Sequence, residues 1–277
     1  NVNNILQYAP DLKEKYPGNA AEIELIRAQA LYIRALVHLN LCCCYGQHYT
    51  YTPDASHWGV PNLSILPSAN DPVLRASVYD VYNKRIIPDL EEAIGIFGST
   101  TMDCYHASAT ACEALLARVY LYMEQWQKAS DYATTVIAKV PLTSYENYVN
   151  MYVNIETGSE AIFRLNGFRA SKDLWKFYDP VSPIARPADT LYTFFDQPDD
   201  IRLELLYATK DEVKTKACRK FYVAKDVVED DKHYDPFVSR VSEMYLIRAE
   251  ANCYLPGGET TAANDIKACL LYTSDAA

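Results

Sequence analysis

Apolar side chains predominate in residues 20–45, and their spacing restricts the chain to folds built around a long, packed helix. One apolar stripe repeats at spacings of three and four residues, the period of one helix face: Ile23, Ile26, Ala30, Ile33, Val37, Leu41 and Cys44. Further leucines lie on other sides, so we expect neighbouring helices on several faces. The helix is expected to end at Tyr45 and Gly46, because glycine readily adopts the backbone conformation that ends a helix.

The same periodicity predicts more helices, with bounds at about 77–97, 106–123, 126–139 and 240–255, and a final helix from Thr260. Ser77 is the expected N-cap of the first of these, and Pro88 is expected to kink it. The connection between the second and third is so short that the two helices must be antiparallel. In this pair, small, aromatic and proline residues stand at tetratricopeptide-like offsets: Ala117, Tyr120, Trp126, Ala129 and Pro141.

The periodicity is lost from about residue 155, where a short strand at 161–165 is followed by prolines and by two short helical segments, 188–196 and 199–207. We therefore predict a mainly α fold, an α-α superhelix of tetratricopeptide-like helical pairs with an irregular capping subdomain. The predicted parts are a scaffold at 1–154, the cap at 155–240, returning scaffold helices at 241–268 and a non-native tail at 269–277.

Composition excludes several functions. The net charge of -10 argues against nucleic acid as a partner, because little on such a surface neutralises phosphate. No apolar run of 18 residues is present. The 8 cysteines include three in succession, Cys42 to Cys44, and form no C-x-x-C pair, so we expect thiols rather than a disulfide framework. The 5 histidines form no metal motif, and no cofactor or metal site is predicted.

The candidate binding residues are aromatic. The chain has 23 tyrosines, and the long segment at 46–76 joins aromatic residues to prolines, a composition that favours a functional loop. We predict that ligand-binding residues lie in this loop and in the cap: Tyr49, Tyr51, His57, Trp58, Trp175, Tyr178 and Arg186. The alternative is that these aromatic rings only fasten the loops to the scaffold.

Four segments, in this order along the chain, resemble the SusD/RagB family of nutrient-binding proteins. The first runs from Ile33 to Gly46 and continues to Gly59, Val60 and Pro61. The others are 75–94, which ends in Asp-Leu-Glu-Glu-Ala-Ile, 114–129 with Glu160-Ala-Ile-Phe beyond it, and 240–251. Each segment alone is weak, but the ordered set is specific and covers most of residues 20–268.

The resemblance implies a non-catalytic protein that binds oligosaccharides at the cell surface and delivers them to a SusC-like, TonB-dependent outer-membrane transporter. It also implies a lipid anchor on the outer face of the outer membrane in the full-length protein, whose export signal we expect to be missing here. A peptide-binding, RagB-like relative and a generic helical-repeat scaffold for protein partners stay open as alternatives. A helical glycoside hydrolase needs two carboxylates about 5–10 Å apart, which the sequence neither supports nor excludes.

Overall fold

The computed structural model describes residues 2–65, 67–68, 70–153, 160–167, 177–178, 184–195, 200–210, 213–221 and 235–270. The chain divides into two compact units, and each is described by itself. The first unit contains Asn1–Lys139 and Ile247–Glu259, and the second contains Val140–Leu246 and Thr260–Ala277. The domain boundaries expected from the sequence stay predictions.

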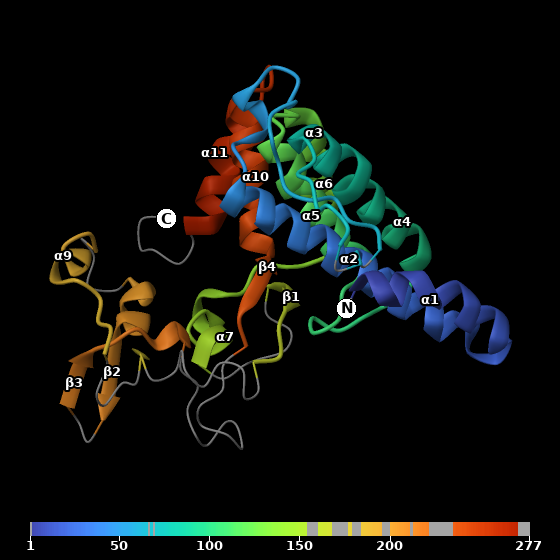
Figure 1. Ribbon diagram of the computed structural model, residues 1–277. Helices are drawn as coiled ribbons and strands as arrows, with labels where there is room; N and C mark the ends of the chain where they lie inside the picture. The colour runs from blue at the N-terminus through green and yellow to red at the C-terminus, as the bar shows by residue number, and fades with distance from the viewer. Residues whose placement is uncertain are drawn as a thin grey trace. The chain divides into compact units, whose positions relative to one another are not determined.

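The first unit consists of helices that pack in chain order (Figure 1). Their bounds are α1 (Val2–Lys15), α2 (Ala20–Tyr45), α3 (Val78–Val81), α4 (Ile87–Phe97), α5 (Ala109–Tyr122) and α6 (Trp126–Ile137). α1 packs against α2, α2 against α4, α4 against α5, and α5 against α6. The prediction of a mainly α fold with tetratricopeptide-like helical pairs is confirmed.

The buried face of α2 differs from the predicted one. Ile26, Val37 and Leu41, placed inward from the sequence, are exposed. Ala30 is buried as predicted, but the other buried apolar residues come from other sides of the helix: Ala28, Leu31, Tyr32, Ala35, Leu36, Leu39 and Cys42. The predicted stripe was wrong because α2 is apolar on several sides, so its periodicity fits more than one face. Although α2 is long and apolar, neither it nor any other described helix has the length and hydropathy to cross a membrane.

The segment at 77–97 is helical as predicted, but with a wider turn in its middle. It begins at Ser77, whose hydroxyl accepts a hydrogen bond from the Asp80 backbone N–H at 3.0 Å. A π-helical turn, Tyr82–Ile86, follows α3 and leads directly into α4. Pro88 cannot donate to the carbonyl of Lys84, and the wider turn accommodates this loss at the predicted kink site. The apolar residues at helical spacing along this segment are all buried: Val78, Tyr82, Ile86, Leu90, Ala93 and Phe97.

The α5–α6 pair is packed at the repeat-like positions. Ala117 and Ala129 have no exposed surface, and the ring of Tyr120, which is also buried, stacks on Tyr132 with 5.6 Å between centroids. The last part of α10 (Val241–Cys253) joins this unit, because the Asn252 side-chain amide donates to the Ser130 hydroxyl of α6 at 3.1 Å. Tyr120 therefore contributes to the packing of the helical pair.

The second unit contains short elements. β1 (Ala161–Arg164) pairs antiparallel with β4 (Phe237–Arg240), and β2 (Tyr207–Lys210) pairs antiparallel with β3 (Val213–Lys216). Its helices are α7 (Asn150–Val153), α9 (Asp189–Tyr192), the first part of α10 and most of α11 (Glu259–Cys269). A small core contains Tyr148, Val149, Met151, Tyr152, Val153 and Leu205.

The sequence overestimated helix length in this unit. Within the described residues of the segment predicted as a helix at 188–196, the helix is the single turn of α9, and the described part of 199–207 contains the 3-10 turn Ile201–Leu206. Such short segments gain few hydrogen bonds for the entropy lost in forming the first turn. The predicted strand at 161–165 is confirmed, and it ends at Arg164.

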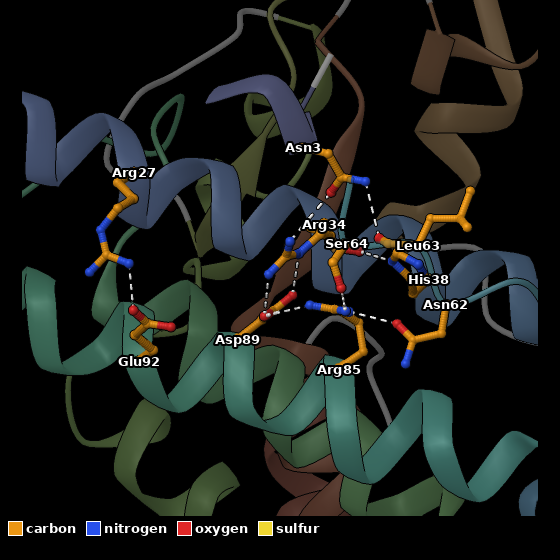
Figure 2. A network of polar contacts seen from close by, with 10 residues as sticks. All are labelled: Asn3, Arg27, Arg34, His38, Asn62, Leu63, Ser64, Arg85, Asp89 and Glu92. Carbon is orange, nitrogen blue, oxygen red and sulfur yellow. Dashed lines mark hydrogen bonds and ion pairs between the residues drawn. The ribbon is translucent and has the colours of Figure 1, made fainter. Parts of the chain in front are cut away.

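A buried ion pair joins α2 to α4 in the first unit (Figure 2). The Arg34 guanidinium donates twice to the Asp89 carboxylate, from Nε at 2.7 Å and from Nη2 at 2.8 Å. Arg85, on the π-helical turn, lies 3.9 Å from the same carboxylate. One buried carboxylate therefore neutralises two nearly buried guanidiniums, and Arg34 contributes to the packing of α2 against α4.

The same network holds the segment at 62–64 against the helices (Figure 2). Arg85 donates from Nε to the side-chain oxygen of Asn62 at 2.7 Å and from Nη2 to the Ser64 hydroxyl at 2.6 Å. From α1, the Asn3 amide donates to the Leu63 carbonyl at 3.0 Å. Residues 62–64, in the middle of the long loop, are therefore held in place by α1 and by the π-helical turn before α4.

His38 lies beside this network and makes the stability of the first unit dependent on pH. Burial lowers the pKa of His38, and the nearby Arg85 and Arg34 lower it further, while a hydrogen bond to the Arg34 carbonyl and the charge of Asp89 oppose the shift. The unfolded chain therefore takes up a proton at this residue before the folded chain does. We expect the free energy of unfolding to fall as the pH drops below about 6.5. Urea unfolding at a series of pH values measures this, and the His38→Gln variant should lose that component of the pH dependence.

Candidate functional site

The aromatic loop at 46–76 is closed at its base by backbone pairing. Trp58 and Ser77 form an antiparallel bridge, and the Gly59 N–H donates to the Ala76 carbonyl at 2.8 Å. A side chain at Gly59 would place its Cβ 3.3 Å from that carbonyl oxygen, so the close approach favours glycine. The backbone around Trp58 is therefore anchored to the start of α3.

Arg75 strengthens this anchor from the other side of the loop. Its Nε donates to the carbonyl of Gly59 at 2.5 Å, and its Nη2 donates to the carbonyls of Tyr45 at 2.7 Å and Trp58 at 3.3 Å. One guanidinium therefore links the last residue of α2 to the backbone that carries the Trp58 ring. Charge-assisted hydrogen bonds of this kind are stronger than neutral ones.

A hollow of about 310 Å³ opens beside this backbone, and we call it the Trp58 hollow. Its lining residues are Tyr45, Gly46, Gln47, Tyr51, His57, Trp58 and Arg75. The side chains of Tyr51 and Trp58 are 65% and 67% exposed, so their rings are accessible to a ligand. The structure thus brings together three of the seven predicted site residues, Tyr51, His57 and Trp58.

The His57 ring in this hollow is fixed on both nitrogens. Because a carbonyl oxygen can only accept, Nε2 is the donor towards Gln47 O at 3.4 Å, and Nδ1 is hydrogen-bonded to the Thr52 hydroxyl at 2.8 Å. The rings of His57 and Tyr51 meet edge to face, with 5.3 Å between their centroids. These contacts hold the His57 ring in place as one wall of the hollow.

Tyr49, the fourth predicted residue of the loop, does not line the hollow. Its ring packs on Tyr82 with 5.0 Å between centroids, and its hydroxyl accepts a hydrogen bond from Asn83 at 3.0 Å. Both partners belong to the π-helical turn. Tyr49 therefore fastens the loop to the helices.

The remaining predicted residues belong to the second unit. The ring of Tyr178 packs on Phe221 with 4.6 Å between centroids. Arg186 is exposed, and it forms no ion pair with another residue of the described ranges. Trp175 lies outside the described residues. Ligand binding by these three residues stays a prediction.

Four residues that line the Trp58 hollow were not selected as site residues from the sequence: Tyr45, Gly46, Gln47 and Arg75. Tyr45 and Gln47 flank the predicted end of α2, and that position was the only available signal for them. Arg75 is distant in sequence, and its role depends on contacts with backbone carbonyls, which no side-chain pattern reveals. In the part of the chain that the structure describes, no three His, Cys, Asp or Glu side chains gather as a metal site.

Residues 1–121, which include the whole Trp58 hollow, match a SusD-like family model described as "Starch-binding associating with outer membrane". These residues are SusD-like. The match supports the resemblance noted in the sequence for the segments that lie within residues 1–121. No curated protein sequence matches the chain.

Solved SusD-like structures share the fold. A SusD-like carbohydrate binding protein from Bacteroides vulgatus has a TM-score of 0.73 and 23% identity, over 91% of this chain and 55% of its own. A SusD superfamily protein from the same species has a TM-score of 0.74 and 22% identity, over 98% of this chain and 65% of its own. A laminarin binding SusD-like protein has a TM-score of 0.68 and 20% identity, over 97% of this chain and 68% of its own. The chain thus spans little more than half to two thirds of the length of these structures.

Proposed function

We propose that the protein captures a neutral oligosaccharide in the Trp58 hollow and does not modify it. The observation that carries the proposal is the pair of exposed rings, Tyr51 and Trp58, held on a backbone fixed by Arg75. Aromatic rings bind the apolar faces of sugar rings, and nearby polar groups such as the Gln47 amide bind hydroxyls. The starch-binding description of the family and the laminarin-binding relative support the same ligand class.

The lining of the hollow favours a neutral ligand over a charged one. Arg75 is its single charged residue, and this guanidinium already donates to three carbonyls. The net charge of -10 disfavours polyanionic glycans at low salt. None of the residues that line the hollow carries a carboxylate, whereas glycoside hydrolysis uses a pair of them. These features support binding without catalysis.

The wider role that we propose is nutrient uptake at the outer surface of the outer membrane. The full-length protein would be lipid-anchored there and deliver the captured oligosaccharide to a SusC-like, TonB-dependent transporter. The family description, which includes association with the outer membrane, supports this location. Co-purification of the full-length protein with its transporter from bacterial outer membranes tests the partnership.

Replacement of Trp58 by alanine is expected to weaken oligosaccharide binding about tenfold, which corresponds to about 1.4 kcal/mol. The exposed indole makes no predicted core contact, so the helices should stay folded. Isothermal titration calorimetry with laminarin-derived and starch-derived oligosaccharides measures the dissociation constant, expected to be about micromolar for the parent. Circular dichroism checks the helix content.

Tyr8→Ala is the matched control, because Tyr8 is an exposed aromatic residue of α1 that does not line the hollow. It should bind like the parent protein. A Trp175→Ala variant tests the contribution predicted for the cap. Unchanged binding by Trp58→Ala refutes the location of the site, and binding of unstructured peptides instead of glycans favours the peptide-binding alternative.

A further inference from the structure

A second hollow adjoins the first in the same unit. It has a volume of about 250 Å³, and its lining residues are Cys42, Cys43, Gly46, Gln47, His48, Tyr82 and Tyr122. We call it the Cys43 hollow. Gly46 and Gln47 line both hollows, so the two hollows adjoin at this dipeptide.

The walls of the Cys43 hollow resemble those of its neighbour in chemical character. Tyr82, Tyr122 and His48 supply aromatic rings, and the His48 and Tyr122 rings lie 6.5 Å apart at an angle of 59°. No carboxylate, lysine or arginine is among the residues that line it. Burial raises the pKa of the Cys42 thiol to about 11 and also raises the pKa of Tyr82, so both line the hollow as neutral groups. The hollow therefore offers aromatic and neutral polar surface, as the Trp58 hollow does.

The wall that carries His48 is anchored to a different part of the scaffold. The Thr50 hydroxyl donates to the Glu124 carboxylate at 3.0 Å. Glu124 lies in the turn between α5 and α6 with a φ of 56°, a conformation that costs a non-glycine residue about 1 kcal/mol. This strained turn positions an acceptor that holds the 48–50 segment against the helical pair. Backbone strain of this kind is typical of ligand-binding segments.

We propose that the Cys43 hollow is a second subsite for the same oligosaccharide, so that the bound chain crosses the Gly46–Gln47 dipeptide. The proposal rests on the function proposed for the Trp58 hollow. Each hollow is near the lower limit of about 300 Å³ for small-ligand sites, so each alone accommodates a short piece of a glycan. Gln47, which lines both, is placed to hydrogen-bond hydroxyls of the sugar units on either side. The ligand class is a neutral glycan longer than a disaccharide.

The first test is the dependence of affinity on ligand length. Calorimetry with laminari-oligosaccharides and malto-oligosaccharides of two to six units should show at least a tenfold tighter binding of the hexasaccharide than of the disaccharide. In Cys43→Phe, whose ring fills the second hollow, this gain should disappear while the disaccharide binds as before. Cys44→Phe is the control, because Cys44 is the adjacent exposed thiol and lines neither hollow.

The second test uses the unmodified protein, and it decides the matter if Cys43→Phe fails to fold. Alkylation of each cysteine in mildly alkaline buffer is followed by mass spectrometry, with and without the hexasaccharide. Cys43 should be protected at least fivefold, whereas Cys44 and Cys253, both exposed, should react at unchanged rates. If oligosaccharides bind but longer ones bind no more tightly and Cys43 is not protected, the second subsite is overturned and the proposed function stays intact. Failure of every oligosaccharide to bind overturns both.

Discussion

Replacement of Asp89 by alanine is expected to lower the free energy of unfolding of the first unit by about 3–5 kcal/mol. The Asp89 side chain is only 6% exposed and accepts two hydrogen bonds from Arg34. Its removal leaves the guanidiniums of Arg34 and Arg85 nearly buried beside each other without a counter-charge. Urea unfolding, followed by hydrogen exchange of the α2 and α4 amides, measures the loss.

Glu92→Ala is the matched control for this prediction. Glu92 also joins α4 to α2, through an ion pair with Arg27, but its side chain is 49% exposed. Water screens such a pair, so its loss should cost less than about 1 kcal/mol. If Asp89→Ala costs no more than Glu92→Ala, the buried network does not hold the two helices together.

Replacement of Glu160 by alanine is expected to destabilise the second unit by a similar amount, about 3–5 kcal/mol. The Glu160 side chain is 0% exposed, and its Oε1 accepts hydrogen bonds from Arg240 Nη1 at 3.0 Å and from the Ser242 hydroxyl at 2.9 Å. These partners flank the junction between β4 and α10, so the loss should free β4 from β1. Hydrogen exchange of the β1 and β4 amides measures the local free energy of opening.

Asp189→Ala is the comparison in the same unit. Asp189 forms an ion pair with Lys216, but its side chain is 87% exposed. The pairing lowers the pKa of Asp189, chiefly through the hydrogen bond from Lys216, yet solvent screening leaves little net stabilisation. Equal exchange rates in Glu160→Ala and Asp189→Ala would show that the buried carboxylate is dispensable.

The sequence predicted the fold where one apolar face was unambiguous. The segment at 77–97 has a single stripe, and the structure buries all of it. α2 has apolar residues on several sides. Whether Val37 or Leu39 points inward therefore depends on which face of α2 the neighbouring helices cover. α1 was not predicted, because Pro10 lies inside it and a proline there argues against a helix. Tertiary packing decided both cases.

The candidate site was predictable only in part. Tyr51, His57 and Trp58 were selected because aromatic residues in a long loop favour binding, and the structure places all three in one hollow. Tyr49 satisfied the same criterion, but a hydrogen bond with Asn83 turns it towards the helices. Sequence composition reveals which side chains are suited to a ligand, whereas the direction in which each one points depends on contacts that form only in the folded chain.

The attachment of the aromatic loop through Arg75 has a consequence for how such proteins diversify. Arg75 holds the carbonyl groups of Tyr45, Trp58 and Gly59, and every amino acid provides that group. The side chains at positions 45 and 58 can therefore change, in evolution or by mutagenesis, without loss of the backbone geometry that presents them. Libraries randomised at these two positions, with Arg75 and Gly59 kept, are thus a direct route to altered glycan preference on an unchanged scaffold.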